Sequence, residues 1–250
     1  MKEVLITALG VGMATVIGAI IGFVFKKVSH KFSDVVMSFA AGIMLAAAVI
    51  GLILPSVELG GKWGLLYAII GIFAGAICLN LMDKLIPHLH RLAGVDSENH
   101  NNANINKVML FVLAIAIHNL PEGIAAGVGF GTGDSGKALL IASGIALQNI
   151  PEGMVIIAPM LAAGISPRKT MVCAIATGVV EVIGTLICYL AVNISTVILP
   201  KALSFAGGTM LYVVSDEMLN ETHAHGHERA ATYSMIVGFC VMLVLDVLLG

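Results

Sequence analysis

Three glutamates stand inside long apolar stretches of the sequence, where acidic side chains are uncommon. Glu122, Glu152 and Glu181 each fall near the middle of such a stretch. If these stretches cross a bilayer, an ionised side chain at that depth costs at least about 2.5–3.5 kcal/mol. No lysine or arginine lies inside the same stretches to pair with them. The carboxylates therefore need protons, water or a bound cation, and hard divalent cations favour such oxygen ligands.

Two of these glutamates belong to a motif that occurs twice. The first copy, H-N-L-P-E-G, runs from His118 to Gly123, and the second, Q-N-I-P-E-G, runs from Gln148 to Gly153. The copies lie on consecutive apolar stretches, which as neighbouring membrane helices would run in opposite directions. Related segments of opposite direction form the midplane site of inverted-repeat transporters. The sequence therefore predicts an inverted repeat with a site at its centre.

The spacing within each motif places the polar side chains together. His118 and Glu122 are four residues apart, so on a helix they face the same direction. Gln148 and Glu152 repeat this geometry on the next helix. An imidazole among carboxylates shifts the preference towards zinc and its transition-metal neighbours. The two asparagines of the motifs, which would lie on the neighbouring flank, are Asn119 and Asn149.

Each motif also carries a proline in mid-helix. Pro121 and Pro151 are predicted to interrupt their helices, each removing one backbone donor and displacing the carbonyl at Ile117 or Leu147. Free polar backbone at that depth is tolerated when it is packed in protein or lines a hydrated cavity. A single kink with one buried polar residue is more often structural. Two matched kinks together with Glu181 favour a functional site.

The composition indicates the elements that must position these side chains. Of 250 residues, 58% are hydrophobic and 11% charged, with a mean hydropathy of +1.00, whereas a soluble domain carries about 25% charged residues. This excludes a soluble protein. A net charge of −2 offers no basic face for nucleic acid. Four cysteines lie in apolar stretches without C-x-x-C pairing, which indicates small buried side chains: Cys78, Cys173, Cys188 and Cys240.

We predict an all-α, polytopic membrane helix bundle in a single domain, because apolar runs of about 20 residues recur along the chain. The eight predicted transmembrane helices cover residues 4–25, 35–54, 64–85, 108–130, 138–161, 171–192, 202–219 and 231–249. The first run has no clear cleavage site after it, so we expect a retained helix rather than a signal peptide. A polar, Asn-rich loop is predicted from about 87 to 107.

The positive-inside rule orients the bundle. One set of alternating loops holds nine cationic residues: Lys26, Lys27, Lys31, Lys84, Arg91, Lys107, Arg168, Lys169 and Arg229. The other set, together with both termini, holds four: Lys2, Lys62, Lys137 and Lys201. The sequence therefore predicts a multi-pass protein of the cell membrane with both termini outside the cytoplasm.

The paired motifs resemble the ZIP family of zinc and iron transporters, and the glutamine of the second motif resembles its GufA-type branch. The likeness extends to T-G-V-V-E-V-I-G around Glu181 and to F-A-G-G-T-M-L-Y-V-V-S-D-E in the seventh run. The resemblance implies transport of divalent metal by a homodimer. It also implies that the first, fourth, fifth and sixth spans move against a scaffold formed by the others.

The resemblance implies a two-metal site. One ion would lie among four motif residues and a soft neighbour: His118, Glu122, Gln148, Glu152 and Met44. A second ion would be held by Asn119, Asn149 and Glu181 together with the same two glutamates, which would bridge. Some relatives have Asp in place of Asn149, so this chain has one charge fewer at the second position. Met44 has an alternative role as ordinary core packing, the commoner one for methionine.

Further polar residues lie near the predicted cytoplasmic helix ends. They form either an exit funnel or interfacial helix-end charges: Asp83, Asp216, Glu217, Glu221 and His223. Histidines of the two loops could capture metal weakly or be solvated loop residues: His88, His90, His100, His223, His225 and His227. Asp34 stands at a span end and is left without a predicted role.

The predicted function is uptake of divalent metal, zinc first, into the cytoplasm, with protons displaced as the ion binds. Fe²⁺, Mn²⁺, Co²⁺ and Cd²⁺ remain alternative cargoes, and no cofactor is expected. A membrane-embedded metalloenzyme is a rival, although no H-E-x-x-H motif is present. A membrane protein that senses metal without moving it is the second rival.

Overall fold

The computed structural model describes residues 1–25, 29–92, 100–194 and 197–249, and over these residues it contains helices and no strands. The all-α class is thus confirmed. The elements in chain order are α1 (Lys2–Val24), α2 (His30–Ala46), η1 (Ala47–Ile53), α3 (Leu54–Leu59), η2 (Gly61–Trp63), α4 (Gly64–Leu92), α5 (His100–Gly129), η3 (Phe130–Thr132), α6 (Ser135–Ala162), α7 (Pro167–Ile194), α8 (Leu199–Tyr212), η4 (Val213–Met218), α9 (Leu219–Thr222) and α10 (Glu228–Leu249).

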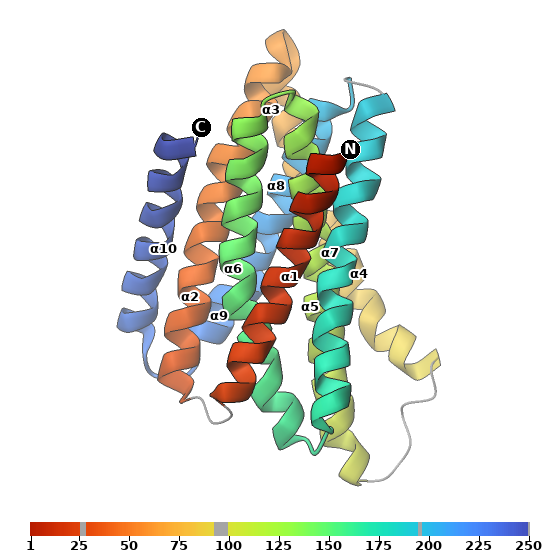
Figure 1. Cartoon of the computed structure of the whole chain (residues 1–250), viewed down its shortest axis with the longest axis vertical. Helices are drawn as coiled ribbons and strands as arrows, with labels where there is room; N and C mark the ends of the chain where they lie inside the picture. The colour runs from red at the N-terminus through yellow and green to blue at the C-terminus, as the bar shows by residue number, and fades with distance from the viewer. Residues whose placement is uncertain (26–28, 93–99, 195–196, 250) are drawn as a thin grey trace.

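The long helices run up and down one bundle, and the start of α1 and the end of α10 lie at the same end of it (Figure 1). Among the described residues, six helical stretches are long and apolar enough to cross a membrane. They cover residues 2–24, 30–59, 61–82, 136–162, 167–192 and 228–248. The remaining two predicted spans correspond to α5 and to the continuous stretch from α8 through α9.

The helices extend beyond the apolar runs that predicted them. Helix α4 continues to Leu92 and α5 begins at His100, so the loop predicted from about 87 to 107 was too long at both ends. The seventh stretch is helical from Leu199 to Thr222, past the predicted end at 219. Hydropathy marks only the apolar part of a helix, whereas polar residues continue the same hydrogen-bonded turns into water.

The prediction that prolines interrupt the helices was also wrong. Pro121 lies inside the continuous helix α5, and both Pro151 and Pro159 lie inside α6. A proline removes only its own N–H from the helix ladder, and packing against neighbouring helices can support the turns on either side.

Helix α1 packs on α6 and α7 with unusually close backbones. A Cβ added to Gly18 would stand 2.1 Å from the carbonyl oxygen of Ile150, and one added to Gly153 would stand 2.1 Å from that of Thr15. Backbones can approach this closely only at glycine, which has no side chain, as in membrane bundles built on small residues. They place the backbone of α1 directly against the second motif.

Two wide turns interrupt the α-helical stretches. The segments η1 and η4 are π-helical, and η1 precedes Pro55, which cannot donate to the carbonyl four residues earlier. Short π segments inside helices often occur at functional sites. The segment η4 carries Asp216 and Glu217, which makes it relevant to the site below.

Candidate metal-binding site

All three glutamates singled out from the sequence are buried, and Glu181 is the most enclosed of them. Its Oε1 accepts hydrogen bonds from the Thr15 hydroxyl at 2.9 Å and from the Asn119 amide. Its Oε2 accepts from the Asn149 amide at 2.5 Å. We call these four residues the Glu181 cluster. It joins α1, α5, α6 and α7 at one point, and it brings together three of the five residues expected to hold a second ion.

The other two glutamates keep free acceptor oxygens. Gln148 donates through Nε2 to Oε1 of Glu122 at 2.8 Å, which leaves Oε2 of that carboxylate without a donor. Within the described residues, five buried oxygens at this level of the bundle have no hydrogen-bond partner: Asn119 Oδ1, Glu122 Oε2, Gln148 Oε1, Asn149 Oδ1 and Glu152 Oε1. Unpaired buried acceptors are rare in proteins and require an explanation, such as a bound ion.

A cavity of about 870 Å³ leads from the buried glutamates to one end of the bundle. At its inner end lie Met44, Glu122 and Glu152, and at its outer end lie the exposed residues Asn220 and Glu221. This end is opposite the two chain termini (Figure 1). Among the described lining residues there is no lysine or arginine, whereas the ionisable ones are His30, Asp34, His118, Glu122, Glu152, Asp216, Glu217, Glu221 and His225.

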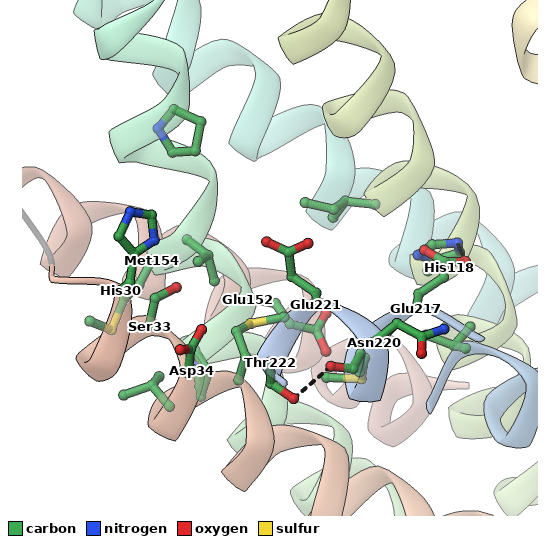
Figure 2. A pocket seen from close by; sticks show the side chains of 18 of the residues that line it. His30, Ser33, Asp34, His118, Glu152, Met154, Glu217, Asn220, Glu221 and Thr222 are labelled. Atoms are coloured by element: carbon green, nitrogen blue, oxygen red, sulfur yellow. Dashed lines mark hydrogen bonds and ion pairs between the residues drawn. The ribbon is translucent and has the colours of Figure 1, made fainter. Parts of the chain in front are cut away.

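His118 and Glu217, which both line this cavity, are in contact with each other. The Nε2 atom of His118 lies 2.6 Å from Oε1 of Glu217, which η4 presents to α5 (Figure 2). The pair couples the first motif to the segment that the sequence suggested as an exit funnel. Sequence reasoning placed Glu217 at a helix end and missed this contact, because nothing in the local sequence marks a π-helical turn.

The mouth of the cavity contains a second polar contact between distant segments. His225 Nδ1 lies 3.0 Å from Oδ1 of Asp34, and the rings of His30 and His225 stack with centroids 4.5 Å apart. Asp34 is only 3% exposed, which is unusual for a carboxylate at a helix start. Figure 2 shows His30 and Asp34 on the α2 side of the cavity. The aspartate left without a predicted role thus lines the same space as the buried glutamates.

The structure does not gather every predicted residue at the cavity. His223 and His227 are not among its described lining residues, and the His223 ring instead lies 3.2 Å from the Thr232 hydroxyl. Met44 is buried in the main hydrophobic core and also lines the inner end of the cavity, so its position fits both predicted roles. The side chains of four further predicted residues lie outside the described part of the chain: Asp83, His88, His90 and His100.

Acidic and histidine side chains alone do not form a metal cage among the described residues. Among the described residues, no three His, Cys, Asp or Glu side chains are grouped so that they could hold a metal ion by themselves. The unpaired oxygens of the asparagines and the glutamine could supply further ligands, because divalent cations accept carboxylate and amide oxygens alike. The site therefore differs chemically from a cage of histidines and cysteines.

Comparison with known proteins gives a consistent match over the whole chain. The family model described as ZIP zinc transporter matches residues 88–246. The chain is 38% identical to the zinc transporter GufA of Myxococcus xanthus over 98% of both chains. It is 36% identical to the zinc transporter ZIPB of Bordetella bronchiseptica, covering 95% of this chain and 78% of that one.

A third relative, the zinc transporter ZupT of Chlorobaculum parvum, is 36% identical over 93% of this chain and 92% of its own. The family match includes both motifs, Glu181 and the segment η4, whereas the part of the cavity lining that comes from α2 lies outside the matched residues. From the motifs, the buried glutamates and these matches together, the chain belongs to the ZIP family of zinc transporters.

Proposed function

We propose that this protein carries zinc and related divalent metal ions across the membrane into the cytoplasm, through the cavity and the buried glutamates at its inner end. The observation that carries the proposal is the charge of the lining. Six carboxylates and three imidazoles line the described cavity and no lysine or arginine does. Such a low-dielectric, acidic passage concentrates cations and repels anions.

Two ion positions follow from the grouping of the ligands. The first lies at the inner end of the cavity among His118, Glu122, Gln148, Glu152 and Met44, with unpaired oxygens on three of these residues supporting it. The second lies at the Glu181 cluster, where an ion must displace the amide donors now bound to Glu181. The first position is open to the cavity, and the second becomes available only after that exchange.

The proposed topology has eight spans with both termini outside the cytoplasm. Helix α5 and the stretch from α8 to α9 are the two spans added to the six long apolar helices. Both termini lie at the end of the bundle opposite the cavity mouth (Figure 1), and Arg168 and Lys169 are exposed beside the start of α7, at the end of the mouth. The positive-inside rule then directs the mouth to the cytoplasm.

The resemblance to ZIP carriers supports a homodimer in which α1, α5, α6 and α7 move as one group. These four helices pack on one another, as do α4 with α8 and α2 with α10. The Glu181 cluster takes one residue from each helix of the first group. A rigid group that contains all the proposed ligands except Met44 of α2 can carry an ion across the membrane while keeping most of its ligands.

Uptake by proteoliposomes that contain only the purified protein tests the proposal. We expect time-dependent accumulation of zinc, inhibited by competing Cd²⁺, Co²⁺, Mn²⁺ or Fe²⁺ in an order that reports selectivity. Repeating the assay with and without a pH gradient shows whether protons move in exchange. Zinc that binds to the vesicles but does not accumulate inside would contradict transport and favour a metal sensor, and zinc-dependent turnover of a substrate would favour a metalloenzyme.

Cysteine labelling in intact cells tests the orientation. In a variant without native cysteines, we expect Lys62→Cys to react with a membrane-impermeant maleimide from outside. Asn220→Cys, at the cavity mouth, is expected to react only after the membrane is permeabilised. Both positions are exposed, so accessibility of the side chain is matched. The reverse pattern would invert the topology and make this cavity an outward-facing one.

A further inference from the structure

The threonine at position 15 behaves unlike six other helical threonines in the described part of the chain. A threonine inside a helix usually returns its hydroxyl to a backbone carbonyl three or four residues earlier. Thr170, Thr177, Thr185, Thr209, Thr222 and Thr232 all do so. Thr15 instead donates at 2.9 Å to the carboxylate of Glu181, which is 166 residues away in the chain. Its side chain is fully buried.

The donors around Glu181 differ in what they can do when a cation arrives. Asn119 and Asn149 each donate through nitrogen while their amide oxygens have no partner among the described residues. Turning either amide would present its oxygen to a cation and withdraw its nitrogen from the carboxylate. A hydroxyl needs no such turn. Thr15 can therefore keep its hydrogen bond while the amides exchange.

From this geometry we infer that Thr15 is a positioning residue of the metal site. Its hydroxyl holds Oε1 of Glu181 in place, so that Oε2 can exchange the Asn149 amide for a metal ion. A carboxylate has about four acceptor positions, and three are now filled. Holding one oxygen removes rotamer freedom that metal binding would otherwise have to restrict. The inference rests on the proposed function, since it assigns Glu181 to an ion position.

The packing of α1 against its neighbours fixes the backbone position of Thr15. The backbone of α1 meets that of α7 at Gly12 and Gly178, one turn before Thr15, where an added Cβ would stand 2.5 Å from a carbonyl oxygen of the other helix. Asn149 also donates to the carbonyl of Val11 at 3.2 Å, on the same turn. These contacts fix the position of the Thr15 hydroxyl along the bundle axis, beside the Glu181 carboxylate. This explains how an almost entirely apolar helix contributes to a polar site.

Three variants separate the hydroxyl from the shape of the side chain. Thr15→Val removes only the hydroxyl, Thr15→Ser keeps it, and Thr185→Val removes an equally buried hydroxyl that bonds the backbone oxygen of Glu181 at 2.9 Å. We expect Thr15→Val to raise the half-saturating zinc concentration for uptake about tenfold, the scale of a hydrogen bond to a charged group. The maximal rate should change less than twofold. Thr15→Ser and Thr185→Val should both stay within twofold of the unchanged protein.

A double-mutant cycle locates the effect at Glu181. A hydrogen bond to an ionised acceptor is about twice as strong as one to a neutral acceptor, so Thr15→Val should cost less when Glu181 is already glutamine. Equal effects of Thr15→Val and Thr185→Val, or a defect in Thr15→Ser as large as in Thr15→Val, would overturn the inference. A double-mutant cycle that shows no coupling between Thr15 and Glu181 would also overturn the inference.

Folding of the variants is checked by size-exclusion chromatography and thermal unfolding. Thr15→Ala replaces Thr15→Val if the latter is unstable. If neither folds while Thr15→Ser does, the hydroxyl is structural and the positioning role is wrong. Zinc uptake by Glu152→Gln separates a failure of the proposed metal site from a failure of the role inferred for Thr15. Full uptake by that variant would reject the proposed site itself, whereas lost uptake together with a normal Thr15→Val would reject only the inference about Thr15.

Discussion

Glu152→Gln is expected to lower zinc flux into proteoliposomes about 100-fold or more, with little change in the folded structure. The glutamine has nearly the same volume as the glutamate, so packing around α6 is preserved. It removes the charge of a buried carboxylate whose Oε1 has no partner among the described residues and which lines the cavity. Residues that merely support metal ligands already change metal affinity about 10- to 100-fold, so a direct ligand should reach or exceed that range.

A matched control for this variant is Glu58→Gln. Glu58 is exposed on α3 and is not among the lining residues of the described cavity. It therefore loses the same charge without touching the proposed path, and its flux should remain within twofold of the unchanged protein. Flux is measured with a zinc-sensitive dye enclosed in the vesicles. Normal accumulation by Glu152→Gln, or an equal loss in Glu58→Gln, would contradict the site assignment.

The burial of the three glutamates could be predicted because apolar runs mark the depth of a residue in a membrane. The spacing of His118 and Glu122 predicted a shared direction, and both now line one cavity. These predictions depend only on local helix geometry and on the length of each apolar run. They needed no knowledge of how the helices pack, so the sequence was sufficient for them.

Contacts between distant segments were beyond the same reasoning. Thr15 looks like an ordinary residue of an apolar helix, and only the packing of α1 on α7 brings it to Glu181. Asp34 and His225 are 191 residues apart in the chain. For each of these residues the sequence offers several other polar residues that would be equally plausible contact partners. Choosing among them requires the relative rotation of the helices, which one sequence does not contain.

Helix ends and wide turns were missed for a different reason. Hydropathy reports where lipid surrounds a helix, so it predicted the apolar core of α4 and not its continuation to Leu92. The π-helical turn at η4 has neither a proline nor a glycine to mark it. A single extra residue in the turn shifts the direction of the side chains that follow. Glu217 lies within this turn and contacts His118, and the prediction of a plain helix did not include that contact.

Glu217→Gln is expected to lower the maximal rate of zinc transport about tenfold, which corresponds to about 1.4 kcal/mol, without raising the half-saturating concentration. The reason is that Glu217 lines the cavity beside the proposed site. Its carboxylate lies 2.6 Å from His118, which is a proposed ligand of the first ion, and it also lines the cavity that leads to the mouth. An ion leaving His118 therefore meets this carboxylate next. Without its charge, release from the inner end becomes slower while binding is preserved.

Asp216→Asn provides the control for this effect. Asp216 is the neighbouring residue on η4, is exposed and lines the same cavity, whereas the 2.6 Å contact with His118 is made by Glu217. Its loss of charge should change the maximal rate less than twofold. Single-turnover release of preloaded zinc, followed by stopped flow, separates release from binding. A normal release rate in Glu217→Gln, or a raised half-saturating concentration at a normal maximal rate, would make Glu217 a part of the binding site instead of the first step out of it.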